Sequence, residues 1–379
     1  MDKRDLYFSI PIIDETTNFW MIRAKRGFFF DEFVNKGFIA IGWNSIKKSM
    51  LSKKLKKEQA DRLKESIKED YEENKPGTSL NKCIRFCCEL KNGDIAVIVD
   101  NGRIAFAYIG DYYEEAAPEL TVELEKEVHK KIEKANQRMD MFDCPYIKRR
   151  KIEIIKVLGI KDTISPYLQS AIARNWHSLS GLNDYAETVL SGCFDTFLFK
   201  GKLTLTFRVK KKSDINVLDL STFVLHAAKL LSDDNPEKVK VKTSLHSPGD
   251  IILQIWDFVQ ENTLPLLICY VAIFGGKVGN YEFNSLLGIV KNIINWKHDK
   301  EKQALELRKL SAEVSLTEQQ ALATKLDNIE KQRNLQLNSV DSYSVSLQNA
   351  AENLEIAPNG AAIIDITSII NKHQNESKK

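Results

Sequence analysis

Few segments of this 379-residue chain bring together residue types that could carry out catalysis. His177 lies beside Ser178 and Ser180, but neither a glycine elbow nor a placed acid accompanies them, and a serine nucleophile needs both. Residues 89–91, Glu-Leu-Lys, have the local pattern of a metal-dependent nuclease, yet a strand of a hairpin region explains them. We therefore expect no catalytic residue. An enzyme with an unrecognised site is a weaker interpretation than either of the two non-catalytic functions given at the end of this subsection.

Metal and phosphate-loop chemistry is not indicated either. Cys83, Cys87 and Cys88 are close together, but their spacing is not Cys-x-x-Cys and no histidine lies near them, so we interpret them as small buried side chains. The Gly-Gly-Lys of residues 275–277 lacks the earlier glycine and the following Ser or Thr of a phosphate loop. The sequence predicts no metal site and no cofactor.

Hydrophobic spacing predicts the elements that surround these segments. Residues 19–24 predict a buried strand, residues 28–36 a helix with a phenylalanine-rich face, and residues 38–41 a second strand. Gly37 lies where a helix C-cap needs a left-handed residue. The expected unit is strand, helix, strand.

A lysine-rich stretch follows over residues 47–75, where leucines at helical spacing predict one or two amphipathic surface helices. Two interpretations of the lysines in residues 47–57 stay open, because such a cluster is either simply solvated or binds phosphates.

The clearest local signal is a β-hairpin. Asn101-Gly102 separates two apolar runs, residues 94–99 and 103–109, and this pair is preferred in the tightest hairpin turns because both central residues need positive φ. A charged helix over residues 119–138 and a strand over residues 146–158 are expected next.

Several motifs in this region occur in the same order in a known family. They are Trp-Met-Ile-Arg-Ala at 20–24, residues 31–33, residues 37–43 ending in Ala-Ile-Gly-Trp, Gly-Asp at 93–94, and the strand over 146–157. In this respect the chain resembles the PUA-like, EVE-type domain at the front of prokaryotic Mrr-type restriction and phage-defence proteins. The resemblance implies a small β-barrel with a cleft that holds a modified base or another feature of a nucleic acid.

One departure concerns the turn after the first strand. Lys25 and Arg26 stand where the family has small residues. If this turn borders the ligand pocket, we expect a ligand that differs from the family's, or the loss of that ligand.

A protein that reads an extruded base needs an aromatic wall, groups that bond the base edge, and cations for the backbone. The candidate ligand-binding residues are Trp20, Trp43 and Tyr108 for the wall, Asn44 and Asp94 for the edge, and Arg23, Arg149 and Arg150 for the charge. Arg103 is a further cation of this kind. For each residue a structural role competes: the two tryptophans could be core residues, and Asp94 could only shape its turn.

The middle of the chain predicts a helical linker and a second domain. Helix formers after Pro166 and Asn183 indicate a linker over 166–195. Within 196–296 we expect an α+β sandwich, with strands over 203–209, 238–243 and 251–255, a helix over 217–231 capped near Asp214 or Asp219, and residues 264–296 as its buried partner.

Residues 297–337 contain neither Gly nor Pro, which predicts a long helix or helical hairpin, with a short tail from Leu354 to residue 379. Thr317 to Gln320 resembles a capping box at a break. Apolar residues at three and four spacing make residues 297–337 a candidate for a coiled coil and for self-association, although clean heptads are too few to establish either.

The composition limits the class of protein. The chain has 55 basic and 52 acidic residues, a net charge of +3, so nucleic-acid binding would require a local patch. Its beginning lacks the apolar core of a secretory signal, and its six cysteines suit a reducing cytoplasm. The most apolar run, residues 264–276, is well short of the roughly 20 residues that span a bilayer. We expect it to be buried core.

The sequence therefore predicts an α+β protein with a PUA-like small β-barrel over residues 1–165, the linker over 166–195, the α+β domain over 196–296 and a helical segment over 297–379. We expect a non-catalytic cytoplasmic module that senses nucleic acid, DNA rather than RNA, with or without a modified base, in a restriction or antiphage defence system. The alternative is a defence effector that acts at a membrane through the apolar 251–276 region.

Overall fold

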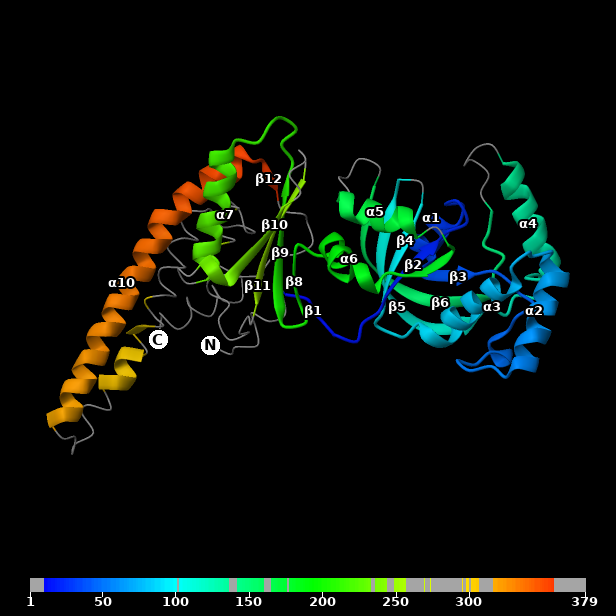
Figure 1. Cartoon of the computed structure of the whole chain (residues 1–379), viewed down its shortest axis with the longest axis horizontal. Coiled ribbons are helices and arrows are strands. Elements are labelled where there is room, and N and C mark those ends of the chain that lie inside the picture. The colour runs from blue at the N-terminus through cyan, green and yellow to red at the C-terminus, as the bar shows by residue number, and fades with distance from the viewer. Residues whose placement is uncertain are drawn as a thin grey trace. The chain divides into compact units, whose positions relative to one another are not determined.

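The computed structural model describes residues 10–100, 102–135, 142–159, 165–175, 177–232, 236–243, 249–256, 269, 273, 295, 298–299, 301–306 and 316–357. The chain divides into two compact units. The first unit is Asp14–Cys193, and the second combines Met1–Ile13 with Phe194–Lys379. Both contain helices and strands (Figure 1), which confirms the predicted α+β class.

The first unit is built on a six-stranded sheet with the order β3-β6-β5-β4-β2-β7. Its strands are β2 (Phe19–Arg23), β3 (Phe38–Ile41), β4 (Ile95–Val99), β5 (Ile104–Glu114), β6 (Lys148–Leu158) and β7 (Leu179–Gly181). Its helices are α1 (Phe30–Lys36), α2 (Lys57–Tyr71), α3 (Pro76–Ile84), α4 (Val122–Lys134), α5 (Pro166–Arg174) and α6 (Ala186–Cys193), with short turns η2 (Lys48–Met50), η3 (Arg85–Glu89) and η4 (Asn183–Tyr185).

The centre of this sheet is buried on both faces, because β4 reads Ile-Ala-Val-Ile-Val without alternation and all five residues are buried. β4 runs parallel to β2 and antiparallel to β5. The register between β5 and β6 shifts twice, at Phe106/Ala107 and at Ile109/Tyr112. Such irregularities bend a strand, and the two long strands curve accordingly (Figure 1).

The predicted helix end, hairpin, charged helix and following strand of this unit are all confirmed. Gly37 ends α1 with φ 68°, and its N–H donates to Phe33. β4 and β5 form the predicted hairpin, in which Val99 pairs with Ile104 and the N–H of Asp100 donates to the carbonyl of Arg103 at 2.9 Å. The helix and strand expected over 119–138 and 146–158 are α4 and β6.

Residues 166–195 do not behave as a linker, and the boundary expected at residue 165 differs from the division at residue 193. β7 pairs antiparallel with β2, so this segment adds a strand to the sheet. α6 also packs closely on β5, since a Cβ at Gly192 would lie 2.7 Å from Cζ of Phe106. Neither contact could be predicted from local spacing.

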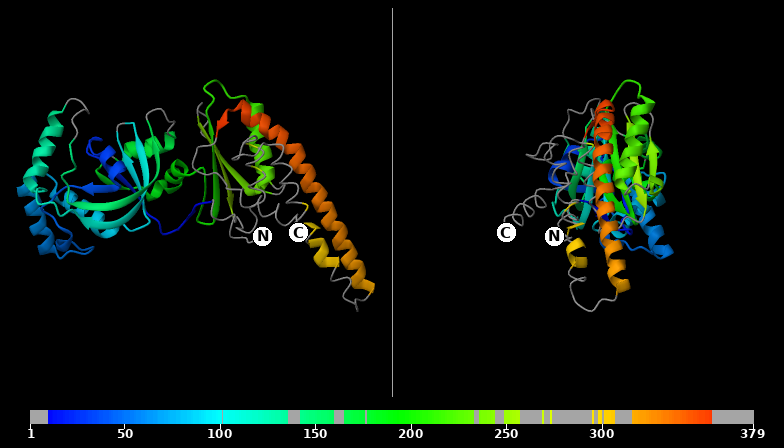
Figure 2. Two further views of the ribbon diagram at one scale, coloured as in Figure 1. Left: turned by 180° about the vertical axis from the view of Figure 1, so that it is seen from behind. Right: turned by 90° about the vertical axis from the view of Figure 1, so that its left-hand side faces the viewer.

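The second unit has another six-stranded sheet, with the order β1-β8-β9-β11-β10 and β12 paired to β9. Its strands are β1 (Ile12–Ile13), β8 (Thr196–Phe199), β9 (Lys202–Val209), β10 (Val239–Thr243), β11 (Gly249–Trp256) and β12 (Ile356–Ala357). Its helices are α7 (Val217–Leu231), η5 (Pro236–Lys238) and α10 (Leu316–Asn353). α7 and α10 lie side by side on this sheet (Figure 2).

Apolar and polar residues alternate along β9, and the apolar ones pack against α7 and α10. Leu203, Leu205, Phe207 and Val209 enter a core with Phe223 of α7, and this core also receives Leu347 and Ala350 of α10. The intervening residues of β9 are Lys202, Thr204, Thr206 and Arg208. Strand, helix, strand, strand is thus the observed order, as expected for residues 203–255.

One detail of the second unit, the cap of α7, differs from expectation. α7 is capped by Asn216, whose Oδ1 accepts from the N–H of Leu218 at 2.8 Å, and not by Asp214 or Asp219. Either acid would also suit a helix start, so the sequence could not separate them. α10 lies within the helical segment expected over 297–379 and ends at Asn353, with Leu347 buried in the core of the second unit.

The apolar 251–276 region is described only in part. Its first residues form β11, and Cys269 and Ile273 are buried in the core of the second unit. The remaining residues, 257–268, 270–272 and 274–276, lie outside the described chain, as does Gly275-Gly276-Lys277. Among the residues described, no helix combines the length and the apolar character that crossing a bilayer requires.

Replacing Asp94 with alanine should destabilise the first unit. The buried carboxylate accepts from Nε1 of Trp20 at 2.9 Å and from the N–H of Lys91 and Asn18 at 2.9 and 3.0 Å. Leaving such donors unpaired costs about 3 kcal/mol in total. Urea unfolding would measure this loss. Asp111→Ala, an exposed change at the same hairpin, should cost less than about 0.5 kcal/mol, and equal losses would contradict the buried role of Asp94.

Candidate ligand cavity

A cavity of about 670 Å³ opens in the first unit between β3, α4, the end of α2 and the turn after β2. Its volume falls in the range of roughly 300–1,000 Å³ that small-molecule sites occupy. The lining residues are Arg23, Lys25, Arg26, Ala40, Ile41, Gly42, Trp43, Tyr71, Glu72, Glu73, Lys82, Glu125, Lys126, His129, Lys130, Glu133, Tyr146 and Ser178. Six of them are lysine or arginine and four are glutamate, so the lining is cationic overall.

A buried carboxylate shapes the floor of this cavity. Glu125 is 1% exposed, and it accepts from the N–H of Trp43 at 2.7 Å, from the N–H of Asn44 at 2.9 Å and from Oη of Tyr71 at 2.7 Å. Burial raises the pKa of Glu125, and the three hydrogen bonds act in the opposite direction. Gly42 leaves room for this group, because a Cβ there would overlap Oε1 of Glu125.

Lys148 holds the same turn from the other side. Its fully buried Nζ donates to the carbonyl of Trp43 at 2.6 Å and to that of Ile46 at 2.9 Å. The turn after β3 therefore has its N–H groups satisfied by α4 and its carbonyls satisfied by β6. With these backbone groups satisfied, the turn that carries Trp43 has a fixed backbone conformation.

Backbone strain is concentrated around the cavity. Among the residues that the structure describes, six that are not glycine have φ in the left-handed region, and four of them line the cavity. They are Lys25 (φ 43°), Arg26 (57°), Trp43 (62°) and Glu72 (53°). This conformation is costly for a residue with a Cβ and persists where surrounding contacts impose it, commonly at functional sites.

A histidine and a tyrosine supply neutral polar groups. Nε2 of His129 and Oη of Tyr146 are 2.8 Å apart. Burial, with the nearby charge of Lys25, lowers the pKa of His129 to about 4, so its ring is neutral near pH 7. Burial raises the pKa of Tyr146 well above its usual value. A neutral ring and a protonated phenol can each donate or accept, which suits recognition of a heterocycle edge.

Trp43 is the aromatic wall of the cavity. Its side chain is half-buried, its Nε1 donates to Oε1 of Glu73 at 3.3 Å, and Nζ of Lys82 lies 5.4 Å from its ring centroid. Burial lowers the pKa values of Lys25 and Lys82. In the described chain, Arg26, Lys126 and Lys130 form no ion pair with an acid. Three cations at this cavity are therefore available to an anionic ligand.

Of the eight residues predicted to bind a ligand, Arg23 and Trp43 line the cavity. Arg23 is held from one side, because Nη2 donates to the carbonyls of Ile172 and Asn175 at 3.0 and 3.2 Å. Its buried Nε has no hydrogen-bond partner, and burial lowers the pKa of this guanidinium.

The other predicted residues are placed elsewhere. Trp20 and Asp94 bond each other in the core, which is the structural role already weighed for both. Asn44 is 5% exposed and uses its side chain to bond the backbone of Pro145 and Ile147 at 2.8 and 3.1 Å. Tyr108, on β5, is half-buried, and burial raises its pKa. None of these four lines the cavity.

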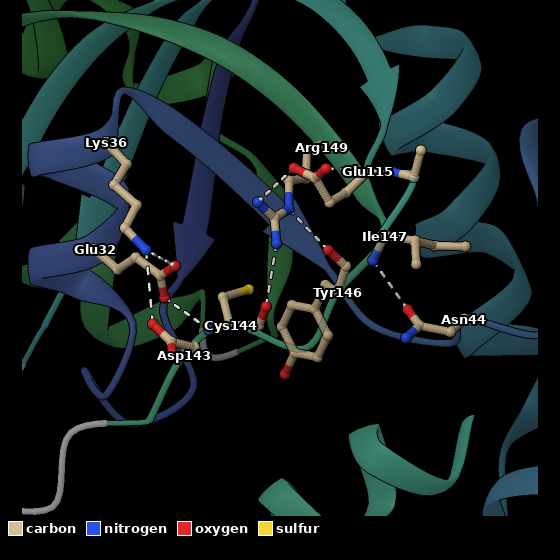
Figure 3. Close-up of polar contacts among 10 residues, drawn as sticks. Glu32, Lys36, Asn44, Glu115, Asp143, Cys144, Tyr146, Ile147 and Arg149 are labelled. Carbon is tan, nitrogen blue, oxygen red and sulfur yellow. Dashed lines mark hydrogen bonds and ion pairs between the residues drawn. The ribbon is translucent and has the colours of Figure 1, made fainter. Parts of the chain in front are cut away.

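The arginines of β6 and of the hairpin are also structural. Arg149 donates to the carbonyls of Tyr146 and Cys144 and to Glu115 (Figure 3). Arg150 donates to three carbonyls, those of Phe86, Leu90 and Gly110. Arg103 pairs with Asp31 and Asp100.

Figure 3 shows how Arg149 fixes the segment that leads into Tyr146. Oε2 of Glu32 on α1 accepts from the N–H of Cys144 at 2.7 Å, and Oε1 of Glu32 pairs with Lys36. Asn44 bonds Ile147 at the far end of the same segment. Tyr146 reaches the cavity because its neighbours on both sides are held.

Sequence reasoning missed Glu125, His129 and Tyr146. One signal was present for Glu125: with Val128 and Ile132 it forms the buried stripe of α4, and an acid on the apolar stripe of a helix is unusual. No local signal marks His129 or Tyr146, since their meeting depends on how α4 crosses the end of β6.

The described residues contain no group of three His, Cys, Asp or Glu side chains able to hold a metal ion. Cys83 and Cys87 are buried and Cys88 is partly buried, as predicted for small core residues. Burial raises the pKa of Cys83 to about 12 and that of Cys87 to about 11, so neither is an activated nucleophile.

Comparisons with known proteins give no match: no family model, no curated protein and no solved structure is similar to this chain.

The buried histidine should make the first unit sensitive to acid. Between pH 6.5 and about 4 the unfolded chain binds a proton at His129 that the folded chain does not, so the free energy of unfolding falls as pH falls through this window, by about 2 kcal/mol. His129→Gln should remove this part of the loss, as urea unfolding from pH 7 to pH 4 would show.

Tyr146→Phe is the matched variant for this test. It removes the hydroxyl but leaves His129 buried, and burial is the largest cause of the lowered pKa, so the acid sensitivity should persist. An His129→Gln profile parallel to that of the unchanged protein would disprove the assignment.

Proposed function

We propose that the first unit binds a nucleic acid and takes a single base into the cavity beside Trp43. The observation that carries this proposal is the composition of one cavity: an aromatic wall, neutral polar groups in its interior, and cations without acid partners at its lining. Reading an extruded base needs these three components together.

Each component has a defined role. The indole of Trp43 would stack on the base, which is worth about 1–3 kcal/mol. Tyr71, Tyr146 and His129 would bond its edge, because each is uncharged near pH 7 and each carries a group that donates or accepts. Arg26 and Lys126 would bind the flanking phosphates.

Lys25 and Arg26, the residues by which the sequence departs from the EVE-type pattern, line this cavity. Their long side chains would occupy part of the cavity and add positive charge to it, whereas small residues at this turn would leave that space open. We infer that the ligand differs from the family's in carrying an anionic group next to this turn. DNA with a modified base, in a restriction or defence setting, remains our first candidate, and the six-stranded sheet is proposed to be a PUA-like barrel.

The proposal involves binding and no reaction. Glu125 already accepts three hydrogen bonds, and we assign it to holding the turn after β3.

Trp43→Gly tests this function without straining the backbone. Glycine accepts the φ of 62° without strain, so the variant removes the wall and keeps the turn. We expect DNA affinity to fall about 10- to 100-fold, measured by fluorescence anisotropy with single-stranded oligonucleotides that carry plain or modified cytosine. Any preference between the two oligonucleotides should vanish.

Tyr167→Ala is the control, because Tyr167 is 60% exposed and does not line the cavity. Its affinity should match that of the unchanged protein. Arg26→Gln should lower the affinity for all oligonucleotides by the same factor and reduce the dependence of that affinity on salt. Absence of DNA and RNA binding by the unchanged protein in 50 mM salt would rule out the proposal.

A further inference from the structure

Residues 47–57, Lys-Lys-Ser-Met-Leu-Ser-Lys-Lys-Leu-Lys-Lys, contain six lysines and no acid. This segment connects the turn after β3 to α2. All six lysines are exposed. No ion pair in the described chain involves any of them.

The segment is fixed on the first unit. Leu51 and Leu55 pack against its core. The N–H of Lys48 donates to Oε1 of Glu114 at 2.8 Å, and Nζ of Lys48 lies 4.5 Å from the ring centroid of Tyr112. The lysines are therefore presented by an ordered backbone with a constant arrangement.

This arrangement opposes the stability of the fold. Lys56 is the N-cap residue of α2 and Lys57 its first residue, and no side chain caps this helix start. Cations are unfavourable at the positive end of a helix, and neighbouring lysines repel one another. α2 itself mixes acids with bases, as in the pair Lys64–Asp61. A run of lysines that costs stability indicates a partner that supplies negative charge.

α2 links this segment to the cavity. The helix begins at Lys57, and Tyr71 at its end lines the cavity together with Glu72 and Glu73. Its 15 residues span about 22 Å. That distance corresponds to about six or seven base steps of a duplex at 3.4 Å each.

We propose that residues 47–57 form a second binding surface, which takes the phosphodiester backbone of the nucleic acid whose base enters the cavity. The identity of the partner rests on the proposed function, while the anionic chemistry rests on the six lysines alone. Of the apolar residues in the segment, only Met50 is strongly exposed, at 46%. Leu51 and Leu55 are committed to the core, so the segment lacks the apolar face that a membrane surface would bind.

The test replaces four of these lysines, Lys53, Lys54, Lys56 and Lys57, with glutamine. The control replaces four exposed lysines of the same unit, Lys68, Lys91, Lys134 and Lys151, with glutamine and so has the same net charge. The probe is fluorescein-labelled single-stranded DNA of about 20 nucleotides, titrated by anisotropy between 50 and 200 mM salt.

Each phosphate contact contributes about 0.7 to the slope of log affinity against log salt for a single strand. Loss of four contacts should lower the slope by about 2.8, so raising the salt fourfold would weaken the variant about 50-fold less than the unchanged protein. The control should retain the full slope. An unchanged slope in the test variant, or equal losses in both variants, overturns the inference.

A 5′-mononucleotide separates this inference from the proposed function, since it can occupy the cavity but cannot reach along α2. Its binding should be lost in Trp43→Gly and kept in the four-lysine variant. If the mononucleotide does not bind while the slope still falls, the lysine surface stands and the base-reading proposal fails. Lysine-dependent binding to phosphatidylserine vesicles without DNA binding overturns the inference in favour of a membrane.

Discussion

The carboxylate of Glu125 is the interaction on which the first unit's cavity depends. The turn after β3 has N–H groups that neither a helix nor a strand satisfies, and Glu125 accepts two of them together with the hydroxyl of Tyr71. Lys148 supplies the donors that the carbonyls of the same turn need. Since both groups are buried, removing either would leave polar atoms unpaired in a medium of low dielectric. The left-handed backbone of Trp43 is maintained by this pair.

Cationic side chains of the first unit differ in what they contact: some pair with acids, as Arg103 does with Asp31, some donate to backbone carbonyls, and some have neither partner. Arg149 and Arg150 donate to backbone carbonyls, because a guanidinium can satisfy several acceptors that lie outside regular structure. Arg26, Lys126 and the lysines of residues 47–57 lack such acceptors and remain available to anions. A net charge of +3 conceals this separation, since most charges of both signs are interspersed over the chain. Our proposal of a polyanionic partner therefore rests on the distribution of the unpaired cations and not on their number.

The candidate site was predicted less completely than the elements around it. Trp43 and Arg23, which were predicted as an aromatic wall and a cation of a base-reading site, both line the cavity. Trp20, Asn44 and Asp94 are also side chains able to bind a base, but in the structure they form hydrogen bonds within the core. The decisive contacts join residues far apart in sequence: 74 residues separate Trp20 from Asp94, and 101 separate Asn44 from Pro145. Spacing along one strand cannot show which polar group finds such a partner.

Periodicity and turn conformation are local properties, so the sequence alone predicted β2, β3, β6, β9, β10 and β11, the hairpin of β4 and β5, the end of α1 at Gly37 and the extent of α7. That residues 166–193 belong to the first unit, and that α4 brings Glu125 and His129 against β3 and Tyr146, became evident from the folded chain alone. Those arrangements follow from the burial of whole elements against one another, and the free energy of that packing is not encoded in any single segment.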